Sequence, residues 1–512
     1  MAGLSKRELL LSLKNATIEA CFSVPMLNLT LSQFPFVIGF AVQALAWRSG
    51  AIGLLAAVYH LANAAQPPLT NFLQRRFSTH RIMVWGFLLN ALPWTFVWVL
   101  PWIGRFRDVT FLAIVIVATL ANSVCSVAWS AAMSVLVPLS IRGRYFGTRN
   151  LIFGFWTLLA VLVAGFAAQH WNSSLHVFGV IYAVAAGARL IGLFFLRRMK
   201  FPAPVMERRQ QAESLADYLR VFRDWNYVWL MLFVGLWGFA LNLGMPFYNV
   251  FVLRELPMRM GHLTVLMTLS SLGGLVALRS WGTLSDRFGN KPVLFAAALL
   301  WALTALPAWL LVGPKHYHHL YVAYFLAGFM TAGFQLAQFN LMLKMVPTES
   351  KAHYISVFLA VTSLLTAAGP LVGGRLLLWL PQQLGTLAGQ PLLRFHLLFA
   401  GSFILALIVL HVIHLMAEPA ERPVGELVRV MRNMREFNPM LGFISLAQFM
   451  FTPRGLSRFA RASLRSVQQS TKVGEELVGV GWRRLRQPFA PGDKTPPAKR
   501  PPGPPRKPQP GS

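Results

Sequence analysis

The feature that most restricts the fold of this chain is a succession of long apolar segments separated by short polar ones. A helix needs about 20 apolar residues to cross a hydrocarbon layer of about 30 Å, and 55% of this chain is hydrophobic. Because backbone groups inside a bilayer must be hydrogen-bonded within their own segment, we predict an all-α integral membrane protein. Twelve segments are predicted to be transmembrane helices, at residues 17–45, 51–73, 81–103, 108–138, 148–170, 174–197, 226–252, 262–283, 292–313, 318–347, 353–380 and 393–416.

Polar stretches divide these helices into two groups of six. We predict an N-terminal six-helix bundle (1–197), a cytoplasmic linker between the halves (198–225), a C-terminal six-helix bundle (226–416) and a basic cytoplasmic tail (417–512). The end of the tail is rich in Pro, Lys and Arg and too poor in apolar residues to pack, so we expect it to be disordered. Earlier in the tail, residues 424–437 are typical of an amphipathic helix, either soluble or lying on an anionic membrane surface.

The basic residues occupy the loops, the linker and the tail rather than the face of a soluble domain. The formal net charge is +30, but with this distribution we expect no nucleic-acid partner. Basic loops mark the cytoplasmic side of a membrane protein. We therefore expect a multi-pass protein of the inner (plasma) membrane with both termini in the cytoplasm, and anionic lipids beside the tail. The absence of organelle sorting signals favours a bacterial membrane.

The two predicted halves retain similarity to each other. Residues 137–145 align without a gap with residues 346–354, and the loop at 73–81 aligns with 284–292 at nearly the same offset, about 210 residues. Two separate matches at one offset indicate duplicated halves. The two bundles are accordingly expected to be pseudo-symmetric.

The loop between the eighth and ninth predicted helices carries the most specific motif. It reads Gly-Thr-Leu-Ser-Asp-Arg-Phe-Gly-Asn-Lys at 282–291 and resembles the loop motif of the major facilitator superfamily of secondary transporters. The resemblance implies alternating access around a central cavity. It also implies that the Asp latches one conformation near a helix start of the opposite bundle, where the helix dipole favours a carboxylate. The residues implied in this latch are Gly282, Asp286, Arg287, Gly289 and Lys291, with Arg142, Arg144 and Arg149 as the candidate partners.

The equivalent loop of the first half departs from this pattern. Arg75 stands in the place of the Asp, and Ser78 stands in the place of the second Gly. A cation at a helix start is unfavourable by the same dipole argument. We therefore expect the loop of the second half to carry most of the latch.

A second element similar to one in this superfamily lies in the eleventh predicted helix. Residues 369–374 read Gly-Pro-Leu-Val-Gly-Gly, whereas the related stretch of the fifth helix, 160–165, keeps only the last glycine. Proton antiporters of the superfamily carry this element in the fifth helix. At the symmetry-related position we interpret it as a site of close packing and bending.

Candidate residues for substrate contact follow from the helices that the resemblance places around the cavity, the first, fourth, seventh and tenth. Amides are costly in hydrocarbon without partners or a wet cavity. Serines of the fourth helix fall on one face, which also fits tight helix packing, and aromatic residues also occur in ordinary packing. The candidates are Asn28, Gln33, Ser126, Trp129, Asn242, Asn249, Gln335 and Gln338.

Titratable residues inside the predicted helices bear on ion coupling. Glu19 is the carboxylate that lies within a predicted helix away from a loop, and His60 lies beside Asn63 in the second helix. A proton-coupled carrier needs such a group in its pathway, so both are candidates for proton coupling. A structural role for His60 remains open. Arg189 lies within the sixth predicted helix, where it can contact an anionic solute or pair with other groups.

The function favoured by these features is transport of a small organic solute across the cytoplasmic membrane, with a possible coupling ion. A lipid-handling carrier or flippase of the same fold, or a non-transporting membrane sensor, remains open as an alternative. Neither a metal-ligand cluster, nor a Ser/His/Asp arrangement, nor a phosphate-binding loop is found in the sequence. We therefore predict neither an enzyme nor a cofactor or metal site, and we expect a monomer.

Overall fold

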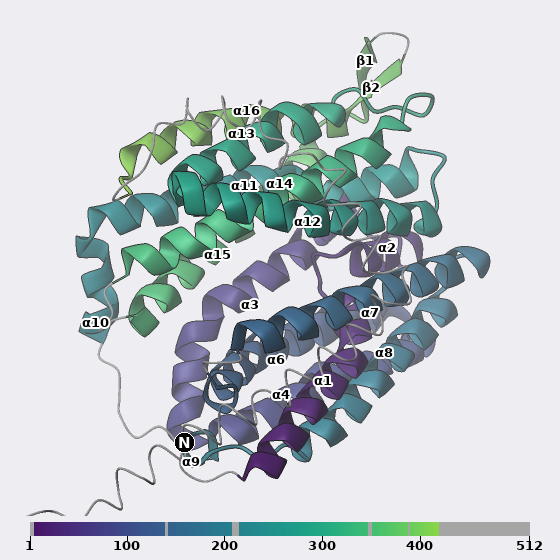
Figure 1. Cartoon of the computed structure of the whole chain (residues 1–512). Helices are drawn as coiled ribbons and strands as arrows, with labels where there is room; N and C mark the ends of the chain where they lie inside the picture. Colours follow the sequence, from purple (N-terminus) through teal and green to yellow (C-terminus); the bar gives the residue numbers. More distant parts are fainter. Residues whose placement is uncertain (1–4, 139–141, 207–214, 347–350, 388–389, 419–512) are drawn as a thin grey trace, which may run out of the picture. The chain divides into compact units, whose positions relative to one another are not determined.

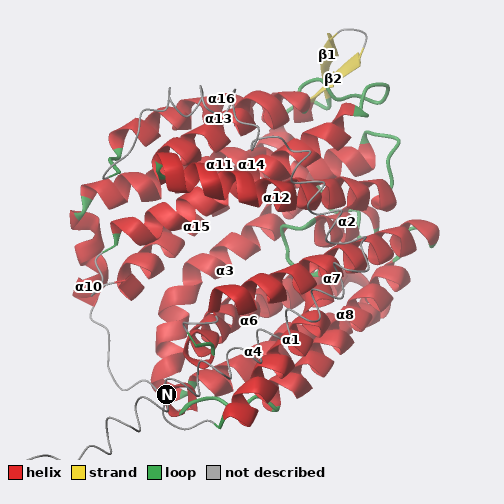
Figure 2. Cartoon of the chain, viewed as in Figure 1, coloured by secondary structure: helices red, strands yellow, loops and turns green. Residues whose placement is uncertain are grey.

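The structure, a computed structural model, describes residues 5–138, 142–206, 215–346, 351–387 and 390–418. These residues are almost entirely helical (Figure 2). The predicted amphipathic and proline-rich parts of the tail lie outside the described residues. All the described residues belong to one compact unit, Met1–Ser463, so the division into bundles at 198–225 stays a prediction.

The long helices follow one another in the order that the sequence predicts (Figure 1). The first group contains α1 (Lys6–Leu29), α2 (Pro35–Gln43), α3 (Ser49–Arg76), α4 (Thr79–Thr95), α5 (Leu100–Ile103), α6 (Arg107–Leu136), α7 (Arg142–His170) and α8 (Leu175–Arg197). The second group contains α11 (Trp225–Arg254), α12 (Met260–Phe288), α13 (Asn290–Ala308), α14 (His319–Met345), α15 (Lys351–Trp379) and α16 (Arg394–Val409).

Short elements join these helices. The short helices α9 (Ala203–Met206) and α10 (Leu215–Arg220) lie between the two groups, and strands β1 (Gln383–Leu387) and β2 (Gln390–Leu393) form an antiparallel hairpin between α15 and α16. Short 3₁₀ helices cover Phe96–Val99, Gly104–Phe106, Val221–Arg223 and Leu410–Leu415.

The described residues include nine stretches that are long and apolar enough to cross a membrane, one of which, Thr79–Leu136, contains both α4 and α6. With α1 and α3, the long helices of the described chain match the twelve predicted segments one for one. The prediction of a twelve-helix, all-α membrane fold is therefore confirmed.

The first predicted segment, 17–45, differs from the structure in detail. The chain forms two helices there, because Pro35 begins α2 at a position where its missing N–H costs nothing. The first of them, α1, starts well before residue 17. Ser5 caps it, accepting a hydrogen bond from the Glu8 N–H while the Glu8 carboxylate accepts one from the Ser5 N–H.

Contacts between the two groups involve α3 with α15, α7 with α12, and α2 with α11. Glycines allow the first of these. A side chain at Gly53 would collide with the carbonyl of Pro370, and one at Gly374 would lie 2.8 Å from the carbonyl of Ser49. The element at 369–374 is therefore a close-packing site, as predicted.

These contacts lie toward one end of the helices. We call the side on which α1 begins the α1 side and the opposite side the far side. Gly53 lies near the start of α3, and α3 begins on the far side. Also on the far side, Arg254 Nη2 donates to Trp47 O at 2.7 Å, and the Gly261 N–H donates to Gln169 Oε1 at 3.0 Å. The two groups are therefore held together on the far side.

Candidate functional site

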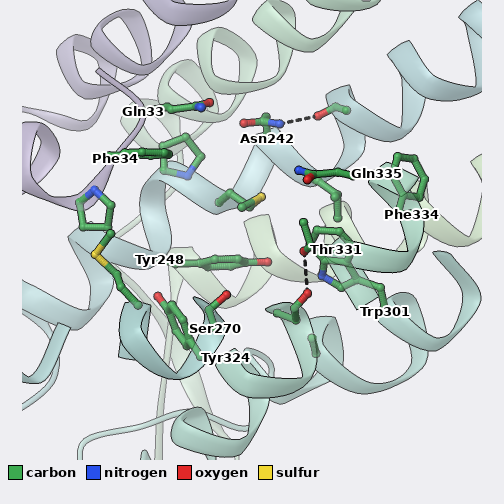
Figure 3. Close-up of a pocket in the computed structure, with 18 of the residues that line it drawn as sticks. Gln33, Phe34, Asn242, Tyr248, Ser270, Trp301, Tyr324, Thr331, Phe334 and Gln335 are labelled. Atoms are coloured by element: carbon green, nitrogen blue, oxygen red, sulfur yellow. Dashed lines mark hydrogen bonds between the residues drawn. The ribbon is translucent and has the colours of Figure 1, made fainter. Parts of the chain in front are cut away.

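A cavity of about 700 Å³ lies between the two helix groups. Its wall includes residues of α1, α3 and α7 from the first group, and of α11, α12, α13, α14 and α15 from the second. Figure 3 shows side chains of both groups around it, with Gln33 and Phe34 from the first and Asn242, Gln335 and Tyr248 from the second. A space of this size accommodates a small organic molecule.

One polar contact joins the two groups at the cavity. His60 Nε2 on α3 lies 3.3 Å from Asn242 Oδ1 on α11. Asn242 Nδ2 donates to Gly238 O at 2.9 Å, as the dashed line in Figure 3 marks, so its Oδ1 can only accept from His60. His60 therefore donates from Nε2 and links the two halves through one side-chain hydrogen bond.

Aromatic rings form much of the second group's wall. Tyr248 and Trp309 stack with centroids 3.9 Å apart and planes 2° from parallel. A second cluster pairs Trp237 with Phe334, stacked at 5.6 Å, and with Trp301, edge-on at 6.3 Å. Because these residues come from α11, α13 and α14, and Trp309 directly follows α13, packing between these helices fixes the orientation of the rings.

The described part of the wall carries amides and hydroxyls but no Asp, Glu, Lys or Arg. Many hydroxyls are already used, since those of Thr268, Ser271 and Thr331 donate to carbonyls of their own helices. The side-chain amides of Gln335 and Gln338 make no hydrogen bond to another described residue, which leaves them free to bind a ligand.

Most of the sequence-derived candidates for substrate contact reach this cavity. The lining includes Asn28, Gln33, Asn242, Asn249, Gln335 and Gln338, and it also includes His60, a candidate for proton coupling. Ser126 and Trp129 on α6 are not among the described lining residues. Ser126 donates to Ser123 O at 2.8 Å within its own helix, and the ring of Trp129 lies against Arg149.

Sequence reasoning missed the contributions of α12 and α13. It considered only the helices that the family resemblance places around the cavity, whereas Ser270, Ser271, Trp301 and Trp309 also line it. The adjacent serines in the middle of α12 were the available signal. Nothing in the pattern of tryptophans marks the cavity, because they are common throughout the chain.

Glu19 lies away from the cavity, in a charged cluster inside the first group. Its carboxylate is 3.8 Å from Arg149 Nη2 on α7 and 3.8 Å from Arg189 Nη1 on α8. The Glu19 and Arg189 side chains are 2% and 4% exposed. Ser23 donates to Glu19 Oε1, and Arg189 lies over the ring of Phe87 at 3.6 Å. We name these four polar residues, Glu19, Ser23, Arg149 and Arg189, the Glu19 cluster.

The predicted latch loop forms the turn between α12 and α13. Gly289 has φ +94°, a conformation that favours glycine, and the next residue begins α13. Asp286 is exposed at the end of α12. Of its predicted partners, Arg149 is paired with Glu19, and the side chains of Arg142 and Arg144 lie outside the described residues. Their contact with Asp286 stays a prediction.

A carboxylate that sequence reasoning missed binds the same loop. Glu418, just after the last helix, accepts from the Lys291 N–H at 2.7 Å, from Lys344 Nζ at 2.8 Å and from Asn290 Nδ2 at 3.1 Å. Burial raises the pKa of this carboxyl, but the three hydrogen bonds outweigh it and hold the pKa below its ordinary value. The available signal was an acidic residue directly after a helix in a very basic chain.

The sequence of this chain resembles a known family, and its fold resembles that of solved structures. The Major Facilitator Superfamily model matches residues 21–278 and 245–460. No curated protein matches the sequence. Similar solved structures include a mutant of the nucleoside transporter NupG, with 14% identity, TM-score 0.63, and coverage of 79% of this chain and 100% of that one.

Two further similar structures are bacterial. A homologue of the iron transporter ferroportin in the inward-facing state has 13% identity, TM-score 0.56, and coverage of 80% of this chain and 99% of that one. A homologue of the lysosomal transporter Spinster, inward-facing and unoccupied, has 15% identity, TM-score 0.52, and coverage of 72% and 82%. At this identity the likeness concerns the fold. Because the family model covers most of the chain, the protein belongs to the Major Facilitator Superfamily of membrane transporters.

Proposed function

We propose that this protein carries a small organic solute across the cytoplasmic membrane by alternating access, with the cavity between the helix groups as its binding site. The observation that supports this most directly is the cavity itself, whose wall is shared by both groups. A solute bound there touches both halves. Movement of one half against the other then changes the side from which the solute is accessible.

The positions of the inter-group contacts support the same proposal. On the far side, glycines bring α3 and α15 together and Arg254 bonds to Trp47. The predicted latch residue Asp286 lies at the α1 side, which we take as cytoplasmic from its basic loops. We propose that Asp286 stabilises the other conformation of the transport cycle, in which the two helix groups meet on the α1 side.

For ion coupling, the two titratable candidates differ in position. His60 lines the cavity and bonds across the two groups, so protonation there acts directly on the contact between them. Glu19 sits in a cluster of opposite charges within the first group. We propose proton coupling through His60 or Glu19, and a monomeric carrier in contact with anionic lipid at its basic tail.

The test combines ligand binding and uptake. Full-length protein in detergent is screened by thermal unfolding against neutral, acidic and basic solutes and against lipids, because a ligand of the folded state raises the unfolding temperature. Uptake of each stabilising solute is then measured in proteoliposomes. Asn242→Ala and Gln338→Ala are expected to weaken binding and uptake, whereas Gln383→Ala, an exposed amide on β1, is not.

Two results would contradict the proposal. Stabilisation and transport of a solute that neither cavity variant weakens would move the binding site elsewhere. Stabilisation by anionic phospholipid alone, together with lipid transfer between leaflets, would favour a lipid-handling carrier.

A further inference from the structure

We infer that the solute is uncharged and combines a flat unsaturated ring with several hydrogen-bonding groups. This inference rests on the proposed function, since it names the class of molecule that the cavity between the two groups binds. Three properties of the wall carry it: the absence of charged side chains among the described lining residues, the stacked rings, and the unused polar groups.

The first property concerns charge. An ion that leaves water needs a partner of opposite charge, because its desolvation is otherwise too costly. The described cavity wall offers amides, hydroxyls and one imidazole, that of His60. The Glu19 cluster is not part of this wall, and its Arg149 and Arg189 already share one carboxylate. The wall therefore suits a neutral solute.

The second property concerns shape. The parallel stack of Tyr248 on Trp309 and the cluster around Trp237 lie on adjacent helices of the second group. Both contribute to the cavity wall. Flat apolar surfaces of this kind favour a flat ring, which can stack on them or pack edge-on against them.

The third property concerns hydrogen bonds. Gln335 and Gln338 line the cavity from α14, and their side-chain amides make no hydrogen bond to another described residue. Each amide supplies both donors and an acceptor. A solute with donor and acceptor groups around a ring satisfies both side chains.

Matched probes test this class directly. Nicotinamide and nicotinate share one ring and differ in a neutral amide against a carboxylate. Phenyl β-glucoside, phenyl glucuronide and glucose separate the contribution of the ring from that of the charge. We expect nicotinamide and phenyl β-glucoside to raise the unfolding temperature of the full-length protein, each at a concentration at least about tenfold lower than its anionic counterpart or glucose needs.

Variants locate the recognition in the cavity. Gln338→Leu keeps a side chain of similar length but removes the amide, and is expected to weaken binding of the neutral ring probes about fivefold to tenfold. Gln383→Leu, at an exposed position on β1 outside the cavity, is the matched control and should change nothing. Gln335→Lys supplies a cation and should shift the preference toward nicotinate by about tenfold.

The outcomes separate the solute class from the transport proposal. If the anions bind as tightly as their neutral counterparts and Gln338→Ala weakens both, the cavity is the binding site but the inferred class is wrong. If neutral ring probes bind and no cavity variant weakens them, both proposals fail. If none of the neutral ring probes stabilises protein that unfolds cooperatively, or if glucose binds as well as phenyl β-glucoside, the class is overturned.

Discussion

The two helix groups place their charged side chains differently. The first group places the Glu19 cluster among its own helices, with Glu19, Ser23 and Arg189 buried. The second group lines the cavity with aromatic and amide side chains, and two carboxylates, Asp286 on α12 and Glu418 after the last helix, lie at or near the loop that joins α12 to α13. Halves that share an ancestor can therefore divide their tasks, with a buried charge cluster between the helices of one half and most of the cavity wall in the other.

The largest expected effect comes from breaking the charge balance in the first group. Glu19→Gln leaves two arginines facing an uncharged amide in a buried site, which should lower the free energy of unfolding by about 3–5 kcal/mol. Thermal unfolding in detergent measures this loss. Glu8→Gln, which removes only the exposed pair with Lys200, is the control and should have a far smaller effect.

A second variant sharpens this test. Adding Arg189→Met to Glu19→Gln removes one of the uncompensated cations and should recover part of the stability. If Glu19→Gln unfolds like the wild type but no longer couples transport to a proton gradient, the cluster is a proton site rather than a structural balance of charges.

The next largest effect is expected at Glu418, the carboxylate that binds the loop between α12 and α13. Glu418→Gln should lower the free energy of unfolding by about 2 kcal/mol, because the hydrogen bonds from Lys344 and from the Lys291 N–H lose their ionic acceptor. Chemical denaturation of the two proteins side by side measures it. Equal stability of wild type and Glu418→Gln would show that Glu418 does not stabilise the loop between α12 and α13.

Acidification provides an independent check on the same carboxylate. The pKa of Glu418 in the folded protein lies below its ordinary value of 4.5. Its contribution to stability is therefore fully present above about pH 4.5 and is lost as the pH falls below that value and through the pKa of the folded state. The difference in stability between wild type and Glu418→Gln should shrink over this range and stay constant at higher pH.

A smaller effect is expected at the contact between the groups. His60→Leu removes the hydrogen bond to Asn242 and should lower the uptake rate about tenfold, while the unfolding free energy changes by only about 1 kcal/mol. Uptake in proteoliposomes is compared with His411→Leu, an exposed histidine at the end of the last helix. If His60→Leu takes up solute as fast as the wild type, the role of His60 is structural.

The smallest effect compares the two related loops. Asp286→Asn should reduce uptake several-fold by weakening the closed state of the α1 side, whereas Arg75→Gln in the first-half loop should have little influence. Initial rates at equal protein density measure both. Comparable losses would mean that both halves contribute to the latch.

The sequence was sufficient for the number and order of the membrane helices, because long apolar segments have few alternatives to a spanning helix. It also placed the amides Gln335 and Gln338 on the cavity wall, since an unpartnered amide in an apolar helix needs a wet surface. It did not show that Glu19 pairs with residues of α7 and α8, because such pairing depends on how helices distant in sequence pack. For the same reason Arg149 was assigned to Asp286 rather than to Glu19.

The glycine contacts between α3 and α15 have a consequence for the relative populations of the two states. The backbones at Gly53 and Pro370 are in direct contact, with no side chain between them. Separating α3 from α15 at this point therefore breaks few polar bonds. A small energy difference between the states is what allows a bound solute of modest affinity to shift their populations. A single methyl group at Gly53 would act as a wedge and hold the far side apart.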